Sequence, residues 1–153
     1  MRFDVAGSQG SGTERKLIGF FVGAVHYGVD IMSVREILRP TTLVPVHSAP
    51  PYVAGVADHR ESVVPVIDMR LRLGLEPSPD TARTKWILVR TSGKDVGLIV
   101  DCVTNVIPVS DADRRERHAV LSSELASWVC GVFGIEGGLL FEIDVDLVVG
   151  LGA

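Results

Sequence analysis

The chain has 153 residues and a formal net charge of −4, and 46% of its residues are hydrophobic, 22% charged and 6% aromatic. Valine occurs 24 times and isoleucine 9 times, and this wealth of β-branched residues favours a mainly β fold with a substantial core over a helical bundle. The mildly acidic balance without a basic cluster argues against a nucleic-acid partner, and no stretch supplies the roughly 18 uninterrupted apolar residues of a membrane span.

Residues 1–14 come first in chain order, and their Gly, Ser and polar composition predicts a disordered tail. They lack the apolar centre of a signal peptide, so we expect a cytoplasmic protein. We expect residues 15–150 to form a single domain made of two intertwined β-barrel subdomains.

From Lys16 onward, short apolar runs alternate with turn residues, which is typical of β-strands. The runs are KLIGFFVG, HYGVDI, VAGVAD, SVVPVID, KWILVRT, DVGLIVD, VCGVFGI and LLFEIDV. Short polar or Gly-rich connections around Arg60-Glu61, Ser92-Gly93-Lys94 and Glu136-Gly137-Gly138 predict β-hairpins.

Helical signals are fewer. The segment from Asp30 to Leu38 places Ile31, Val34 and Ile37 on one helical face and stops before a proline, which predicts a short helix. Farther along, Ser110 followed by Asp113 predicts a cap that opens a solvated helix in DADRRERH. Asp146 marks the start of a final turn.

An internal repeat is more informative than any single element. A shift of 76 residues aligns VAGVADHRESVVPVIDMRLRLG with VCGVFGIEGGLLFEIDVDLVVG without a gap, and a shift of 69 aligns Lys16 with Lys85 and Gly28 with Gly97. The repeat predicts two similar β units, each a small barrel or half-barrel, that pack together and share a core. Asp68 and Asp144 occupy equivalent places after a strand, and we expect each to cap the following turn.

No catalytic constellation stands out. Cys102 and Cys130 have no zinc-ligand spacing, so we expect two buried thiols, and the histidines lack metal-binding companions, so no metal or cofactor is predicted. Asp58 and His59 are the best acid–base candidates, but neighbours in a strand point to opposite faces. An enzyme that uses this pair is the least favoured hypothesis.

Four segments resemble the CheW family, the coupling proteins of bacterial chemotaxis. They are YGVDIMSVREI (27–37), GVADHRESVVPVIDMR (55–70), VGLIVDCVTNVI (96–107) and the closing stretch 131–149, and their order and spacing match over about residues 16–149. The resemblance implies two five-stranded, SH3-like β-barrels packed together with short helices, no catalytic activity and a domain that stands alone.

The resemblance also implies partners. A CheW-like adaptor bridges the cytoplasmic tip of methyl-accepting chemoreceptors and the regulatory domain of a CheA-type histidine kinase, so it meets the membrane only through the receptors. By that likeness, the receptor-binding residues are Ile31, Val34, Glu36, Arg60, Val103 and Val106. The kinase-binding residues are Leu43, Val53 and Gly55.

The chemistry of these residues suits the implied role. An amphipathic helical tip needs an apolar groove, which aliphatic Ile31, Val34, Val103 and Val106 can line, although each also suits an ordinary core. Glu36 and Arg60 can pair at the rim of that groove and set orientation more than affinity.

The hairpin departs from the family pattern. Where most relatives carry Asn-Leu-Arg-Gly, this chain has Asp58-His59-Arg60-Glu61. Loss of the glycine predicts a different or strained turn, and the added charge changes the rim. The alternative function is therefore a β-barrel binding module in a non-chemotaxis system, or an array component that does not activate a kinase.

Overall fold

The computed structural model describes residues 14–116 and 127–150, so nearly all of the expected tail lies outside the described residues. The strands are β1 (Arg15–Val22), β2 (Val25–Asp30), β3 (Val34–Leu38), β4 (Val53–His59), β5 (Ser62–Asp68), β6 (Lys85–Thr91), β7 (Lys94–Val100), β8 (Cys102–Val109), β9 (Arg114–Arg115), β10 (Val129–Ile135) and β11 (Gly138–Ile143). The described helices are α1 (Met69–Arg72) and α3 (Val145–Val149), with 3-10 turns at Ile31–Ser33 and Asp111–Asp113.

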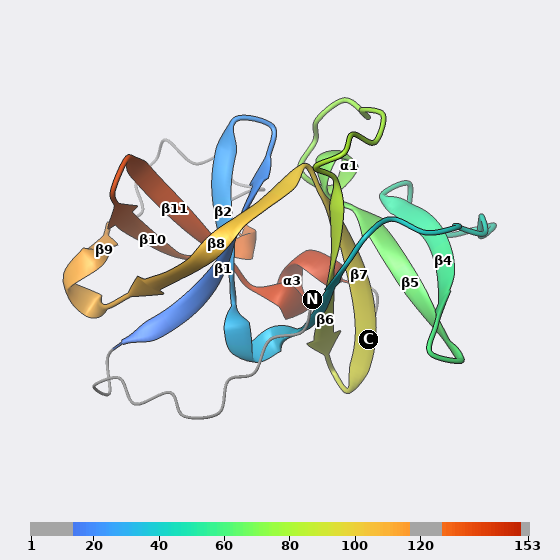
Figure 1. Cartoon of the computed structure of the whole chain (residues 1–153), viewed down its shortest axis with the longest axis horizontal. Helices are drawn as coiled ribbons and strands as arrows, with labels where there is room; N and C mark the ends of the chain where they lie inside the picture. Colours follow the sequence, from blue (N-terminus) through green and yellow to red (C-terminus); the bar gives the residue numbers. More distant parts are fainter. Residues whose placement is uncertain (1–13, 117–126, 151–153) are drawn as a thin grey trace.

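The strands form two sheets, as the mainly β prediction requires. One sheet has the order β8-β1-β2-β11-β10-β9 and the other β3-β6-β7-β5-β4; we call them the six-stranded and the five-stranded barrel. In Figure 1 they lie on either side of α3. The prediction of two five-stranded barrels is confirmed except for β9, a two-residue strand that adds a sixth to one sheet.

The internal repeat is visible in the strand register. The β4–β5 pair has a bulge between Val53 and Gly55, and the β10–β11 pair has the same bulge between Val129 and Gly131, 76 residues later. Each barrel also contains one parallel pair, β5 with β7 and β11 with β2. However, the sequence repeats are not the barrels, because each half of the chain gives strands to both.

Three apolar clusters hold this architecture together. The largest lies between the barrels and includes Phe20 and Val29 from one and Ile87 and Leu98 from the other. Separate clusters fill the barrel interiors: Leu17, Val109, Phe133 and Leu140 in the six-stranded barrel, and Ala57, Val66 and Trp86 in the five-stranded one. The shared core confirms the expectation that two small units pack against each other.

The predicted helix from Asp30 to Leu38 is wrong. Only Ile31–Ser33 forms a 3-10 turn, and β3 follows at once. Val34 and Ile37 are both buried because the β3–β6 register shifts between Val34 and Glu36. This bulge inserts one residue, so two apolar side chains three positions apart share one face of a strand, as they would on a helix.

The helix predicted in DADRRERH is also wrong within the described residues. Ser110 and Asp113 do form the expected capping box, with the Ser110 N–H donating to the Asp113 carboxylate over 2.9 Å. The chain then turns into β9, which pairs with β10, and residues 117–118 of the segment lie outside the described ranges.

The two aspartates that end equivalent strands behave as predicted. The Asp68 carboxylate accepts the Arg70 N–H over 2.9 Å at the start of α1. The Asp144 carboxylate accepts the Leu147 N–H over 3.1 Å at the start of α3, which contains the turn expected at Asp146.

Arg72 joins the two halves. Its guanidinium carbon lies 4.1 Å from the ring centre of Tyr52 and 4.6 Å from that of Trp128, which are equivalent in the repeat. The Arg72 Nε also donates to the carbonyl oxygen of Val148 in α3 over 2.7 Å. One side chain therefore fixes the end of α1 to α3.

Candidate functional site

A charged cluster on the five-stranded barrel contains two of the predicted site residues. The carboxylate of Glu36, on β3, accepts a hydrogen bond of 3.1 Å from the Nη2 of Arg60, which confirms that these two side chains pair. The Nε2 of His59 lies 3.3 Å from the other Glu36 oxygen. The Arg60 side chain is 60% exposed whereas that of Glu36 is only 14% exposed, so the arginine presents the cluster to solvent.

The electrostatics of Glu36 reflect two opposing effects. Burial raises the pKa of the carboxyl group, but the hydrogen bond and charge of Arg60, helped by His59, outweigh it and leave the pKa below its usual value. Glu36 is therefore ionised at neutral pH.

The hairpin that carries Arg60 has an unusual backbone. Arg60 has φ of 52° and Glu61 has φ of 68°, and β4 and β5 end at the pair His59–Ser62. Two consecutive positive φ angles are the pattern of a type I′ turn, which favours Asn and Gly. The prediction of strain at Glu61 is thus confirmed, and the turn aims Arg60 toward β3.

The apolar residues predicted for the receptor fall into two groups. Val34 is buried, and Ile31 and Val103 are half-buried against the core that the barrels share. Val106 on β8 is 37% exposed and pairs with Ile18 of β1. Much of this set therefore serves as core, and Val106 offers the most accessible apolar surface.

The residues predicted for the kinase lie along one edge of the five-stranded barrel. Val44 and Val56 exchange reciprocal backbone hydrogen bonds of 2.8 and 2.9 Å, so the segment around Leu43 lies against β4. Gly55 has φ of 151°, and a Cβ there would lie 2.5 Å from the Val44 carbonyl oxygen. Gly55 thus allows this close approach, while Leu43 and Val53 are half-buried.

Three exposed apolar residues were not predicted: Val44 and Val46 along this edge, and Val63 on the neighbouring strand β5. Val44 is 57% exposed, Val46 46% and Val63 73%. The isolated bridge from Val44 to β4 comes from tertiary contacts that no local pattern reveals. These side chains show that part of the 46% hydrophobic content of the chain lies at the surface.

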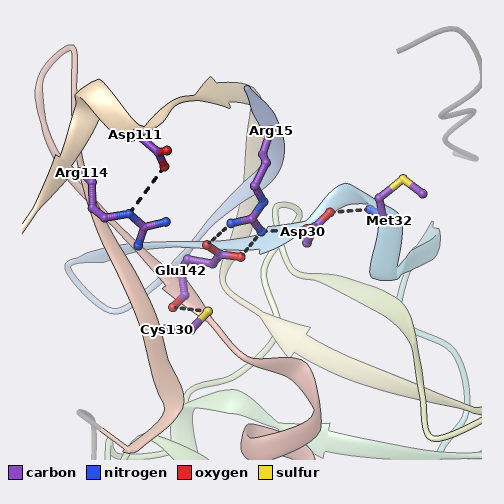
Figure 2. A network of polar contacts seen from close by, with 7 residues as sticks. All are labelled: Arg15, Asp30, Met32, Asp111, Arg114, Cys130 and Glu142. Carbon is purple, nitrogen blue, oxygen red and sulfur yellow. Dashed lines mark hydrogen bonds and ion pairs between the residues drawn. The ribbon is translucent and has the colours of Figure 1, made fainter. Parts of the chain in front are cut away.

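A second charged cluster joins β1, β2 and β11 of the six-stranded barrel (Figure 2). The Arg15 guanidinium donates to both Glu142 oxygens, one over 3.0 Å, and its Nη2 also donates to Asp30 over 2.7 Å. Glu142 is 4% exposed. Its hydrogen bond holds the pKa of Arg15 above the usual range in spite of partial burial, with a further contribution from Asp30. The role of this network is structural, because it pairs a nearly buried carboxylate with a cation.

The two cysteines differ from the prediction of two buried thiols. Cys102 is buried, but Cys130 is exposed, because it occupies the bulge between Val129 and Gly131 where the side chain turns out of the ladder. The Cys130 sulfur still contacts the Glu142 carbonyl oxygen at 3.7 Å (Figure 2). The residue is exposed as a whole, but partial burial of its sulfur, with Glu142 and Asp144 nearby, raises the pKa of Cys130 to about 11.

Asp58 and His59 do not form the acid–base pair that an enzyme would need. Asp58 is exposed, whereas His59 is half-buried and turns toward Glu36. Residues 14–116 and 127–150 contain no group of three metal-ligating side chains. In the same ranges, no helix is long and apolar enough to cross a membrane.

The site thus combines an ion pair on a strained turn with exposed aliphatic side chains elsewhere on a double β-barrel. Such surface chemistry is typical of a protein that binds other proteins. A family model described as the CheW-like domain matches residues 16–151. The chemotaxis protein CheW of Rhizobium meliloti (strain 1021) is 37% identical over 134 residues, which cover 88% of this chain and 86% of that protein. That of Bacillus subtilis (strain 168) is 34% identical, with coverage of 89% and 87%.

A solved structure agrees with these sequence matches. The scaffolding protein TtCheW from Thermoanaerobacter tengcongensis superposes with a TM-score of 0.80 at 25% identity, covering 88% of this chain and 91% of that one. The chain belongs to the CheW family.

Proposed function

We propose that this protein is a non-enzymatic adaptor that couples methyl-accepting chemoreceptors to a CheA-type histidine kinase. In this role it is cytoplasmic and is recruited to membrane-associated receptor arrays. The family membership and the scaffolding or chemotaxis names of its relatives support the proposal. The observation that carries it is the Glu36–Arg60 pair, which presents an exposed arginine from a strained turn.

The receptor-facing site of the proposal comprises Ile31, Val34, Glu36, Arg60, Val103 and Val106. Val106 supplies exposed aliphatic surface and Arg60 supplies a fixed charge, and a helical partner with an apolar face and acidic residues beside it would complement both. Glu36 acts on the partner through Arg60, whose position it sets.

The kinase-facing site of the proposal comprises Leu43, Val53 and Gly55 at the edge of the five-stranded barrel. The exposed side chains of Val44 and Val46 extend it. Among the described residues, the segment around Val44 pairs with β4 through an isolated bridge. Its outer side therefore offers backbone groups that a partner barrel can approach.

Binding to a receptor fragment tests the receptor-facing site. The Arg60→Ala protein should remain folded and bind a soluble fragment of the cognate receptor tip at least about tenfold more weakly, because the fixed charge is lost. Arg90→Ala is the matched control, since Arg90 is also an exposed arginine, 48% by side chain, paired with a single carboxylate. Equal affinity of the Arg60→Ala and wild-type proteins would contradict the assignment.

A further inference from the structure

The interior of the five-stranded barrel contains an open cavity of about 210 Å³. Its apolar walls include Ala57, Val64, Val66, Trp86 and Leu88. Its polar lining comes from Arg39, Thr41, Asp58 and His59. All five apolar side chains are at most 4% exposed, so the cavity penetrates the barrel instead of lying on its surface.

The repeat shows what fills the same place in the six-stranded barrel. The position equivalent to Ala57 is Phe133, and the position equivalent to Val64 is Leu140, each 76 residues later. Phe133 and Leu140 pack together in that interior and are 1% and 0% exposed. A phenyl ring thus occupies one interior, and a methyl group stands at its place in the other.

Other substitutions compensate for only part of this difference. The five-stranded barrel has Trp86 where the six-stranded barrel has Leu17, and Leu88 where the latter has Gly19, 69 residues apart in each case. These larger side chains line the cavity and still leave it open. An apolar cavity of roughly 150 Å³ is known to accept benzene in a protein core, so the remaining space suffices for an aromatic ring.

The cavity also adjoins the proposed receptor-facing site. His59 lines the cavity and lies 3.3 Å from Glu36, which pairs with Arg60. The polar lining also includes Arg39 and Thr41. A partner docked against Arg60 would therefore have its polar groups near this lining and could place an apolar side chain inside.

We propose that this cavity receives one aromatic side chain of the helical receptor segment that binds at Glu36 and Arg60, in the place that Phe133 fills in the other barrel. This inference rests on the proposed function. It predicts that the receptor contributes an anchor residue to the barrel interior in addition to its contacts with Arg60.

Filling the cavity from within tests the inference. Ala57→Phe and, as a milder change, Val64→Leu copy the residues of the six-stranded barrel, so both should fold with an unchanged or higher melting temperature. Each should weaken binding of the receptor fragment by about tenfold or more, since an anchor excluded from its pocket is lost as a hot spot. The matched control is Val63→Leu, because Val63 is the neighbouring, 73% exposed residue on the opposite face of β5.

A second measurement does not depend on the receptor. Indole titrated into the wild-type protein should shift the methyl NMR signals of Val64 and Val66, and the Val64→Leu protein should show a weaker shift at Val66. Wild-type affinity for the receptor fragment in both cavity-filling variants, with Arg60→Ala still impaired, would overturn this inference and leave the proposed function intact. Failure of the wild-type protein to bind the receptor fragment would overturn both.

Discussion

The two barrels share a strand order and a pair of matching bulges, yet they fill their interiors in different ways. The six-stranded barrel contains Phe133 in its interior and an ion-pair network of Arg15, Glu142 and Asp30. At the positions of Arg15 and Glu142, the five-stranded barrel has Thr84 and Val66. The interior of one barrel is thus filled by a phenyl ring and borders a charged network, while the other interior keeps an open cavity with mostly apolar walls.

This difference teaches which features determine the fold. The register, the bulges and the capping aspartates are retained in both barrels, so they specify the architecture. The contents of the interior and the tip of the hairpin vary, so they are available for function. The barrel with the open cavity also carries the Glu36–Arg60 pair.

The largest expected effect is on stability and concerns the ion-pair network of the six-stranded barrel. Arg15→Thr, which copies Thr84, removes the cation from nearly buried Glu142 and should lower the free energy of unfolding by about 3 kcal/mol, because a buried charge is left without its partner. Urea denaturation measures this loss. The double variant Arg15→Thr/Glu142→Val copies the other barrel and should recover most of the lost stability. Equal instability of the single and double variants would contradict this role of the Arg15–Glu142 ion pair.

The next effect concerns the contact between the halves. Arg72→Ala removes two cation–π contacts and one hydrogen bond and should cost about 2 kcal/mol of unfolding free energy. Hydrogen exchange should report the loss first in α3, whose Val148 carbonyl loses its donor. Arg90→Ala is a control that removes an exposed ion pair, with Asp95, and should cost less. A cost for Arg72→Ala no larger than for this control would argue against the joining role.

The third effect concerns the tips of the equivalent β4–β5 and β10–β11 hairpins, where substitutions should change the free energy of unfolding in opposite directions. Glu61→Gly should stabilise the protein by about 1 kcal/mol, because glycine adopts positive φ without steric strain. Gly137, with φ of 90° in the equivalent hairpin, supplies the converse: Gly137→Ala should destabilise although no atom lies near the new Cβ. Thermal denaturation of both variants decides the comparison, and shifts of the same sign would refute it.

The smallest effect is the pH dependence of the Glu36 cluster. The pKa of Glu36 is lower in the folded protein than the 4.5 of the unfolded chain. The ion pair therefore contributes fully to stability above pH 4.5, and this contribution is lost as the pH falls through the pKa of the folded protein. Glu36→Gln should cost at most about 1 kcal/mol near pH 7, because Arg60 is largely solvated. The difference from wild type should shrink below pH 4.5, and a constant difference across pH would exclude this origin.

Much of the fold was predictable because the responsible signals are local. The three predicted hairpin turns lie where Arg60-Glu61, Ser92-Gly93-Lys94 and Glu136-Gly137-Gly138 place them. A fourth tight turn, between Val22 and Val25, was not predicted. The repeat predicted the shared register, and the equivalence of Asp68 and Asp144 predicted two caps.

The errors and omissions have physical reasons. A bulge in β3 imitates helical spacing, so periodicity alone could not distinguish the two structures. The exchange of strands between the halves, the bridge at Val44 and the position of Arg72 depend on contacts between distant segments. Of the candidate site, the Glu36–Arg60 pair was predicted, but the contact of His59 with Glu36 was not, since it joins β4 to β3, at the opposite end of the strand order.

Co-sedimentation tests the central claim most directly. Vesicles bearing the cognate receptor are mixed with the regulatory domain of the CheA-type kinase, with or without this protein, and the pelleted kinase domain is measured. The account predicts that the kinase domain pellets only when the wild-type protein is present, and that Arg60→Ala abolishes most of this effect. Equal pelleting of the kinase domain with and without the protein would contradict the account.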